Sequence, residues 1–379
     1  MVKSRIVDYF ISLVEIDSES KDELAIARKL QYDLESMGAE VIFDNANTYT
    51  GGNVGNMIVR IPGVIEKPPL LFCAHLDTVS PGKGVKPVIR DNRIFSDGTT
   101  ILGADDKSGI AEVIEALRRL KEEKIPHASI ELVFTVSEEI GLLGTKHLDY
   151  SLLESKIGYV LDGHEIGSIT IQAPALNLFN IVVHGRASHA GVFPEKGINA
   201  IKVASDAISH IKTGRYDKET TVNIGEIQGG IATNIVPNSV TIKGEVRSHS
   251  EDKLNEVTNE IIATFENVAK KYRIQNEMGM HTARIEADVK KDFSAIKIKK
   301  ESKVVQMALD AAKRLNLKPE LEIGGGGSDA NIFYSNNIDM TILGTGMQNF
   351  HSLTESISID DLEAGTTWLM EIIKNHSKK

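Results

Sequence analysis

Side chains that can ligate a metal ion lie in five short stretches of this chain, four before residue 164 and the fifth beyond residue 349. In chain order they are His75-Leu76-Asp77, Gly103-Ala104-Asp105-Asp106-Lys107, Ser137-Glu138-Glu139, Leu161-Asp162-Gly163 and Phe350-His351-Ser352. If these stretches form one site, both ends of the chain must meet in one domain. The residues between them, whose pattern differs, must then form a module inserted into that domain.

The first part of the chain alternates helical and strand-like patterns. Strand-like apolar runs at 57–61, 69–76 and 129–136 are interleaved with amphipathic helical stretches. Such alternation, with nearly continuous apolar strands, is typical of a mostly parallel sheet covered by helices on both faces. Helix and strand signals of this kind return after Ser294. We therefore predict an α/β catalytic domain built from two separate parts of the chain.

The middle of the chain alternates apolar with polar residues, as expected for a half-exposed antiparallel sheet. Its predicted strands lie near 176–184, 220–227, 240–247 and 282–289, and its predicted helices near 197–212 and 251–272. These elements would form an inserted α+β domain with a four-stranded antiparallel sheet and two helices. The predicted domain parts are 1–174, 175–293 and 294–379.

Composition narrows the class of protein. The chain has 379 residues, is 41% hydrophobic and carries a net charge of −10, which argues against a nucleic-acid partner. No apolar run approaches the roughly 18 residues needed to span a membrane. The basic start Met1–Arg5 is not followed by the apolar core of a secretion signal. Cys73 is the single cysteine, which excludes an internal disulfide and favours the cytoplasm.

The ligand set itself indicates which metal it would bind. Histidine nitrogens and carboxylate oxygens without cysteine suit a borderline divalent ion such as zinc, with cobalt or manganese left open. Five protein ligands exceed the three that one catalytic zinc usually takes. They suit two ions that share a carboxylate, roughly 3.5–4 Å apart. Glu138, beside a ligand, would then be free to act as a proton shuttle.

The spacing within each stretch assigns further roles. His75 and Asp77 stand two residues apart on an extended run and point to the same side, so one can bind metal while the other orients it. Asp105 is the expected bridging ligand, whereas its neighbour at the start of a helix could simply favour the positive helix end. Glu138 and Glu139 point apart on an extended chain and therefore need different roles, a general base and a ligand.

The inserted module offers candidates for substrate contact. His189 follows a strand, Asn234 lies in a polar loop and Arg247 ends a strand. A donor histidine, a donor amide and a cation could polarise a carbonyl and hold a carboxylate. Each could instead be an ordinary surface or turn residue, and Arg247 could pair with the local acid Glu245. The glycines at 324–327 lack a following Gly-Lys-Ser/Thr, so close approach to a substrate or a flexible turn is favoured over phosphate binding.

Taken together, the stretches resemble the dizinc exopeptidase family that includes tripeptidase T, aminoacylases and succinyl-diaminopimelate desuccinylase, and the peptidase T-like members are the most similar. The matching segments are His75-x-Asp77, Gly103 to Lys107, Glu138-Glu139, Asp162, Ser188-His189, Asn234 to Pro237 and His351. The resemblance spans nearly the whole chain, and its combined motifs are specific.

The resemblance implies the following set of roles. One zinc is held by His75 and Asp162, the other by Glu139 and His351, and Asp105 bridges them, with Glu138 as the base, Asp77 orienting His75, and a cis peptide bond between Asp105 and Asp106. The inserted domain would be a lid and a homodimer surface, from which His189 reaches the site of the partner chain. Asn234 and Arg247 would grip the substrate.

The resemblance predicts a zinc aminopeptidase acting on dipeptides or tripeptides. Tripeptidase T carries an arginine just before the Gly-Gly-Thr-Asp that resembles Gly326-Gly327-Ser328-Asp329, and here that place is Gly325. Strict selectivity for tripeptides is therefore not predicted. The alternatives are an N-acyl amino acid amidohydrolase or carboxypeptidase of the same family and a non-catalytic metal-binding homologue.

Overall fold

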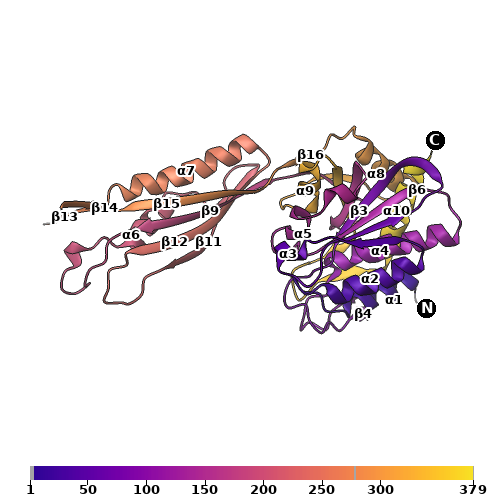
Figure 1. Cartoon of the computed structure of the whole chain (residues 1–379), viewed down its shortest axis with the longest axis horizontal. Coiled ribbons are helices and arrows are strands. Elements are labelled where there is room, and N and C mark those ends of the chain that lie inside the picture. Colours follow the sequence, from indigo (N-terminus) through magenta and orange to yellow (C-terminus); the bar gives the residue numbers. More distant parts are fainter. Residues whose placement is uncertain (1–3, 277–278, 379) are drawn as a thin grey trace. The chain divides into compact units, whose positions relative to one another are not determined.

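The computed structural model describes residues 4–276 and 279–378. Within it the chain forms two compact units (Figure 1). Unit 1 comprises Met1–Gln172, Lys297–Gly324 and Ser328–Lys379, and unit 2 comprises Ala173–Ile296 and Gly325–Gly327. The predicted class, a mixed α/β sheet with a further antiparallel α+β part, is confirmed.

Unit 1 is built around a mixed sheet that has nine strands in the described residues. In spatial order the strands are β1 (Glu40–Phe43), β2 (Met57–Ile61), β6 (Ala128–Thr135), β3 (Ile65–His75), β7 (Ile157–Gly163), β18 (Asp339–Gly344), β8 (Ser168–Ala173) and β16 (Ile296–Lys297), and β17 (Glu320–Ile323) also pairs with β8. Strands β6, β3, β7 and β18 run parallel to one another. Their carboxyl ends therefore lie along one edge of the sheet, where open α/β sheets place their sites.

Helices cover both faces of this sheet. They are α1 (Arg5–Val14), α2 (Leu24–Ser36), α3 (Asn47–Thr50), α4 (Ala104–Glu122), α5 (Leu143–Lys146), η1 (Tyr150–Leu152), α8 (Lys303–Arg314), α9 (Asp329–Ser335) and α10 (Ile359–Ser377). Phe72 stacks on Tyr159 at 5.7 Å, and the Tyr159 hydroxyl donates to the Val304 carbonyl of α8 at 2.7 Å. The next residue, Cys73, points the other way and its thiol meets Asp329 of α9 at 3.7 Å. Adjacent residues of a strand face opposite sides, so α8 and α9 pack on opposite faces.

A small second sheet lies beside the large one in unit 1. Its strands, in spatial order, are β19 (Met347–Gln348), β20 (Ser356–Ser358), β5 (Arg93–Phe95) and β4 (Val88–Arg90). These strands of two or three residues carry too little periodicity to be recognised in the sequence. They join the segment after β3 to the segment that contains His351.

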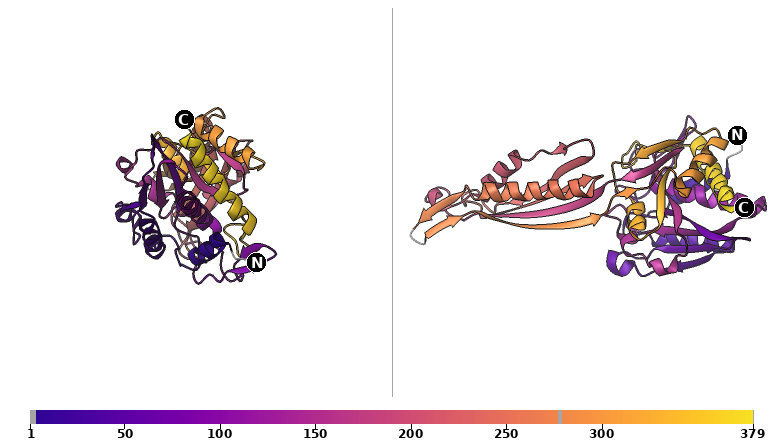
Figure 2. Two further views of the ribbon diagram at one scale, coloured as in Figure 1. Left: turned by 90° about the vertical axis from the view of Figure 1, so that its right-hand side faces the viewer. Right: turned by 90° about the horizontal axis from the view of Figure 1, so that it is seen from above.

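Unit 2 is an antiparallel sheet covered on one face by helices. Its strands, in spatial order, are β10 (Gly214–Arg215), β11 (Thr220–Gly229), β12 (Ser239–Ser248), β9 (Ala175–His184) and β15 (Arg284–Phe293), with helices η2 (Pro194–Lys196), α6 (Ala200–Ser209) and α7 (Glu251–Ala269) and a separate pair β13 (Arg273–Asn276) and β14 (Gly279–Thr282). Figure 2 shows α7 lying along the strands. The four long strands are the predicted ones, and β10 is a two-residue addition at the edge.

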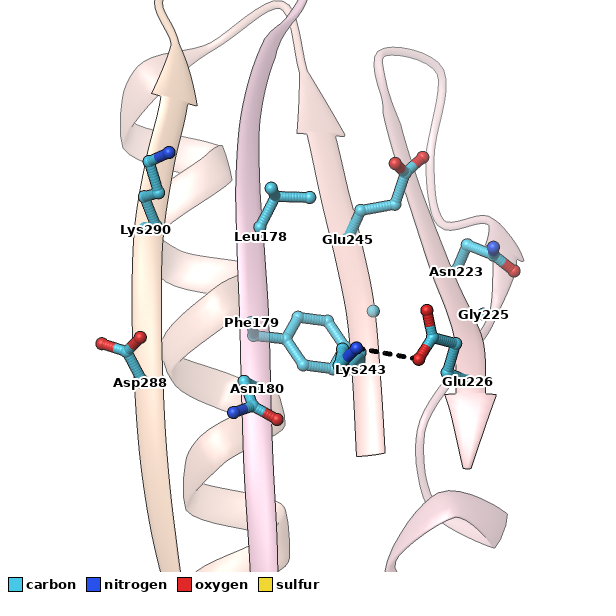
Figure 3. A pocket seen from close by; sticks show the side chains of 11 residues that line it. Leu178, Phe179, Asn180, Asn223, Gly225, Glu226, Lys243, Glu245, Asp288 and Lys290 are labelled. Atoms are coloured by element: carbon cyan, nitrogen blue, oxygen red, sulfur yellow. Dashed lines mark hydrogen bonds and ion pairs between the residues drawn. The ribbon is translucent and has the colours of Figure 1, made fainter. Parts of the chain in front are cut away.

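The alternation along β9 explains which face the helices cover. Phe179, Ile181 and Val183 are buried with Phe265 of α7, whereas Leu178 is 38% exposed. The face that the helices leave free has a hollow of about 350 Å³, lined mainly by polar and charged side chains such as Asn180, Lys243 and Glu226 (Figure 3). None of the predicted metal ligands lines this hollow.

In the part of the chain that the structure describes, none of the helices combines the length and the apolar character needed to cross a membrane.

Candidate metal centre

Three of the predicted stretches meet because their strands are neighbours. His75 is the last residue of β3, Asp162 is the last but one of β7, and Glu138 and Glu139 follow the end of β6. Strand β3 lies between β6 and β7, and all three are parallel. The topology therefore delivers these side chains to the same edge of the sheet.

Asp105 lies at the irregular start of α4. Gly103 precedes it with a left-handed backbone (φ +77°), and the bond between Asp105 and Asp106 is cis, as the resemblance implied. Asp105 Oδ1 lies 2.8 Å from His75 Nε2, and its Oδ2 lies 3.1 Å from His351 Nε2. The two oxygens of one carboxylate thus face two different imidazoles.

A second carboxylate completes each side of Asp105. Asp162 Oδ1 lies 4.0 Å from His75 Nε2, and Glu139 Oε1 lies 2.8 Å from His351 Nε2. The donor atoms of His75, Asp105 and Glu139 all lie within 4.8 Å of one another. Unit 1 therefore brings together the five residues that the sequence suggested as ligands.

The charges of this cluster are strongly coupled. Hydrogen bonds with Asp105 and Glu139 raise the pKa of His351 to about 10. Burial opposes the same effect at His75, but its contact with Asp105 still raises that pKa well above the ordinary value. Burial raises the pKa of Asp162, and the charge of Asp105 raises it further. Protonated imidazoles thus offset the negative charge of the crowded carboxylates. Divalent cations compete with these protons for the same nitrogen and oxygen atoms.

Asp77 links the base candidate to the ligands. Its Oδ1 accepts the backbone N–H of Glu138 at 2.9 Å, and its Oδ2 accepts the backbone N–H of Glu139 at 3.2 Å. The Ser20 hydroxyl donates to the same Oδ2 at 2.6 Å. His75 Nδ1 lies 2.9 Å from the Asp77 carbonyl oxygen and 3.5 Å from its carboxylate. Asp77 is fully buried, so these contacts hold three predicted site residues, His75, Glu138 and Glu139, in a fixed arrangement.

The second aspartate of the 105–106 pair is not a solvated helix-start residue. Asp106 is fully buried, and its Oδ2 accepts the backbone N–H of His75 at 3.2 Å. Its Oδ1 is buried without a hydrogen-bond partner, and burial raises the pKa of the carboxyl group. Asp106 therefore supports the strand end that carries His75.

Two buried carboxylates next to the cluster were missed by the sequence analysis. Glu355 accepts the backbone N–H of Asp105 at 3.1 Å. Asp329 accepts hydrogen bonds from the hydroxyl groups of Thr135, at 2.6 Å, and Thr145. Neither belongs to an apolar periodic pattern. The available sequence signals were the positions of Glu355 four residues after His351 and of Asp329 two residues after the last glycine of a glycine run.

Unit 2 holds the three candidates for substrate contact, and two of them lie together. The backbone N–H of Ala190 donates to the Asn234 carbonyl at 2.9 Å, next to the bridge between His189 and Ile235. His189 Nδ1 accepts the backbone N–H groups of two following residues at 3.2 Å each. The proton of a neutral His189 therefore belongs on Nε2, which can donate.

Arg247 pairs with the local acid Glu245, the alternative to substrate contact that the sequence left open. Its Nε donates to Glu245 Oε1 at 2.8 Å, and its second guanidinium nitrogen donates to Oε2 at 3.2 Å. The Arg247 guanidinium also lies about 4.0 Å from the point that a β-carbon on Gly326 would occupy. Arg247 thus borders the glycine loop within unit 2 while paired with a local acid.

The residues of unit 1 fit two divalent cations. Three carboxylates and two imidazoles converge, and the oxygens of Asp105 are divided between the two imidazoles. A nitrogen and oxygen set without thiolate suits zinc and related ions. Two metals held by such a set can share one carboxylate.

Comparison with known proteins identifies the family of this chain. Residues 71–375 match the sequence model of peptidase family M20/M25/M40. The chain belongs to the M20 peptidase family. The resemblance to the family of tripeptidase T is thereby confirmed.

Three relatives of this M20 peptidase cover almost its full length. The Bacillus subtilis protein YqjE is 39% identical over 377 residues, which cover 99% of both chains. The crystal structure of aminopeptidase PepT from Bacillus cereus is 38% identical, with a TM-score of 0.90 over 99% of this chain and 98% of that one. The structure of a tripeptidase from Staphylococcus aureus is 36% identical, with a TM-score of 0.93 over 99% and 98%. The M20 chain is therefore a hydrolase of the peptidase class.

Proposed function

We propose that this M20 peptidase is a metal-dependent aminopeptidase that hydrolyses dipeptides and tripeptides with two zinc ions per chain. The observation that carries the proposal is the division of the Asp105 carboxylate between His75 at 2.8 Å and His351 at 3.1 Å. The printed activities of two structural relatives, an aminopeptidase and a tripeptidase, support the class of substrate. Cobalt or manganese could take the place of zinc in such a site.

The proposed ligand sets follow the two sides of Asp105. One ion would be held by His75 and Asp162, the other by His351 and Glu139, and Asp105 would bridge them. The side chains on each side are already within 4.0 Å of a shared imidazole nitrogen, which supports the assignment. Two ions bound there would polarise the scissile carbonyl and lower the pKa of the attacking water.

Glu138 is the proposed general base. Burial raises the pKa of its carboxyl group well above the ordinary value, and among the surrounding charges Asp162 and Glu139 raise it further while His75 opposes them. A base is most effective when its pKa lies near the working pH. Glu138 takes the proton of the attacking water and returns it to the leaving amine. The hydrogen bond from its backbone N–H to Asp77 keeps it beside the ligands.

Unit 2 would supply the substrate contacts. His189 is proposed to donate from Nε2 to the oxyanion that develops on the scissile carbonyl, since its Nδ1 already accepts two backbone N–H groups. Asn234 and Arg247 are proposed to hold the peptide. The proposal includes residues 175–293 as an inserted lid and dimerisation domain, a homodimer in which His189 acts on the partner chain, and a cytoplasmic location.

The test is a titration followed by a substrate screen. The metal-free enzyme should bind zinc until two equivalents per chain are reached, and activity should return with the metal. Dipeptides and tripeptides with a free amino terminus should be cleaved, and their N-acetylated forms should not. Saturation at one equivalent would refute the bridged centre. Preferential cleavage of acylated substrates would assign the chain to the N-acyl amino acid amidohydrolases, and release of the carboxyl-terminal residue to the carboxypeptidases. Two bound ions without turnover of either substrate group would match a non-catalytic homologue.

A further inference from the structure

Glu355 collects three backbone N–H groups from the segment that carries Asp105. Its Oε2 accepts from Leu102 at 2.7 Å and from Gly103 at 2.8 Å, and its Oε1 accepts from Asp105 at 3.1 Å. The side chain is buried, with 1% exposure. The Glu355 carboxylate thus holds the backbone of residues 102–105, about 250 residues away in the sequence. This backbone sets the direction of the Asp105 side chain.

The backbone of this stretch is irregular. Asp105 and Asp106 have non-helical backbone angles although they lie inside α4, and Gly103 before them is left-handed. The first N–H groups of a helix have no partner within the helix. An external carboxylate that accepts them therefore determines the course of the chain into Asp105.

Glu355 also ends the loop that carries His351. It directly precedes β20, where Ser356 pairs with Phe95 of β5. Its own backbone N–H donates to the Ser352 carbonyl at 3.1 Å. The His351 loop is therefore closed at the residue that grips the Asp105 segment, so both sides of the contact between His351 and Asp105 Oδ2 converge on Glu355.

We infer that Glu355 is a positioning residue for the second ion of the proposed centre, setting the spacing between Asp105 Oδ2 and His351. The role rests on the proposed function, because it requires two ions. Partners one layer behind metal ligands typically change metal affinity by about 10–100-fold when they are replaced. Glu355 acts on the side of His351, so the ion held by His75 and Asp162 should be less affected.

Replacement of Glu355 by glutamine disturbs one particular hydrogen bond of the three. Its carbonyl oxygen can keep the two N–H groups of Leu102 and Gly103, and its amide nitrogen then faces the N–H of Asp105. Two N–H donors then face each other at Asp105, the residue proposed to bridge the two ions. A buried donor left without an acceptor is costly, so the Asp105 backbone should shift.

Glu131 provides a matched control. It is 3% exposed in unit 1, and its oxygens accept the backbone N–H groups of Glu154 at 3.0 Å and Ser155 at 2.9 Å. It lies on β6, opposite Leu71 of β3, four residues before the ligand-bearing end of that strand. Glu131→Gln thus removes the same kind of buried carboxylate without touching the metal segments.

The experiment is a zinc titration of the metal-free full chain by calorimetry, carried out on wild type, Glu355→Gln and Glu131→Gln. Wild type and Glu131→Gln should each bind two ions, and each ion should bind to the variant with its wild-type affinity. Glu355→Gln should bind the first ion as wild type does and the second about 10–100-fold more weakly. The Tm of both variants in chelator should fall, and the gain in Tm on adding zinc should be reduced only for Glu355→Gln.

Two results would overturn the role of Glu355. One is binding of both ions to Glu355→Gln with wild-type affinity, and the other is an equal loss in Glu131→Gln. Saturation of the wild type below two ions would refute the proposed centre itself, and this role with it. Glu355→Asp keeps the charge but is one methylene shorter, and it should show the same selective loss to a smaller degree. It replaces Glu355→Gln if that variant does not fold.

Discussion

Replacement of Glu138 by glutamine separates proton transfer from metal binding. Glutamine keeps the shape of the side chain and removes its basicity. The backbone N–H of residue 138 still donates to Asp77, 2.9 Å away in the wild type, so the side chain should keep its place. Glu138 belongs to neither proposed ligand set. The variant should therefore retain two metal ions per chain and lose turnover.

The expected loss follows from the environment of Glu138. A positioned general base contributes about 10²–10⁴-fold to the rate, which equals about 2.7–5.4 kcal/mol of activation free energy. Burial, Asp162 and Glu139 raise the pKa of Glu138 and make it a stronger base than an exposed glutamate. We therefore expect kcat to fall by about 10²–10⁴-fold.

The pH profile gives a second readout of the same residue. Glu138 must be deprotonated to accept a proton, so activity should rise as pH increases through its pKa. Burial raises this pKa above the ordinary value of 4.5, and bound cations oppose the shift. The acid limb of kcat/KM should be present in the wild type, and it should be absent from the residual activity of Glu138→Gln.

The assay combines elemental analysis with steady-state kinetics on a free tripeptide. Glu139→Gln is the matched control, because the neighbouring glutamate is a proposed ligand and its replacement should lower metal content as well as turnover. Near-normal kcat in Glu138→Gln with full metal content would refute the assignment of the base. Loss of metal from Glu138→Gln would instead make that residue a ligand.

Three further predictions concern parts outside the ligand cluster. His189→Ala should lower kcat by about 10²–10³-fold without changing metal content, and mixed dimers with Glu138→Gln chains should regain activity if His189 acts across the dimer; no recovery in verified mixed dimers would favour action within one chain. Arg247→Ala and amidation of the peptide carboxyl terminus should each lower kcat/KM by about 10–100-fold, and their effects should not multiply; equal discrimination against amides in wild type and variant would show that Arg247 serves its local ion pair. Burial lowers the pKa of His376, whose Nε2 lies 2.8 Å from the Pro68 carbonyl, so the unfolded chain binds a proton more readily and stability should fall as pH drops below about 6.5. His376→Gln should reduce this loss in Tm scans, and an unchanged pH dependence would contradict it.

The sequence pointed to the proposed ligands because most of them stand where apolar runs end. His75 and Asp162 stand at the ends of apolar runs, and parallel strands bring such ends to one edge of a sheet. The separation of His351 from the others indicated that the middle of the chain is an insertion. The long strands and helices were likewise predictable, since ten or more residues carry a clear period.

The supporting contacts were not predictable for a different reason. Glu355, Asp329 and Ser20 act by accepting or donating hydrogen bonds, and a polar residue in a loop has no pattern that distinguishes this role from solvation. The small sheet of β4, β5, β19 and β20 is made from strands too short to show alternation. Arg247 is the clearest example, because the sequence was compatible with two partners for its guanidinium, a substrate carboxylate and Glu245. In the structure Arg247 Nε donates to Glu245 Oε1 at 2.8 Å.

Unit 2 begins and ends on neighbouring strands, which bears on how its insertion affects the large sheet. Strand β9 starts unit 2 and β15 finishes it, and the two are direct neighbours, with Leu176 opposite Phe293. On the other side of the same junctions, β8 and β16 are also neighbours in the large sheet. The chain thus leaves the large sheet and returns to it at adjacent strands. Because the points of departure and return are neighbours, only a short connection between β8 and β16 would be needed to continue the large sheet without unit 2.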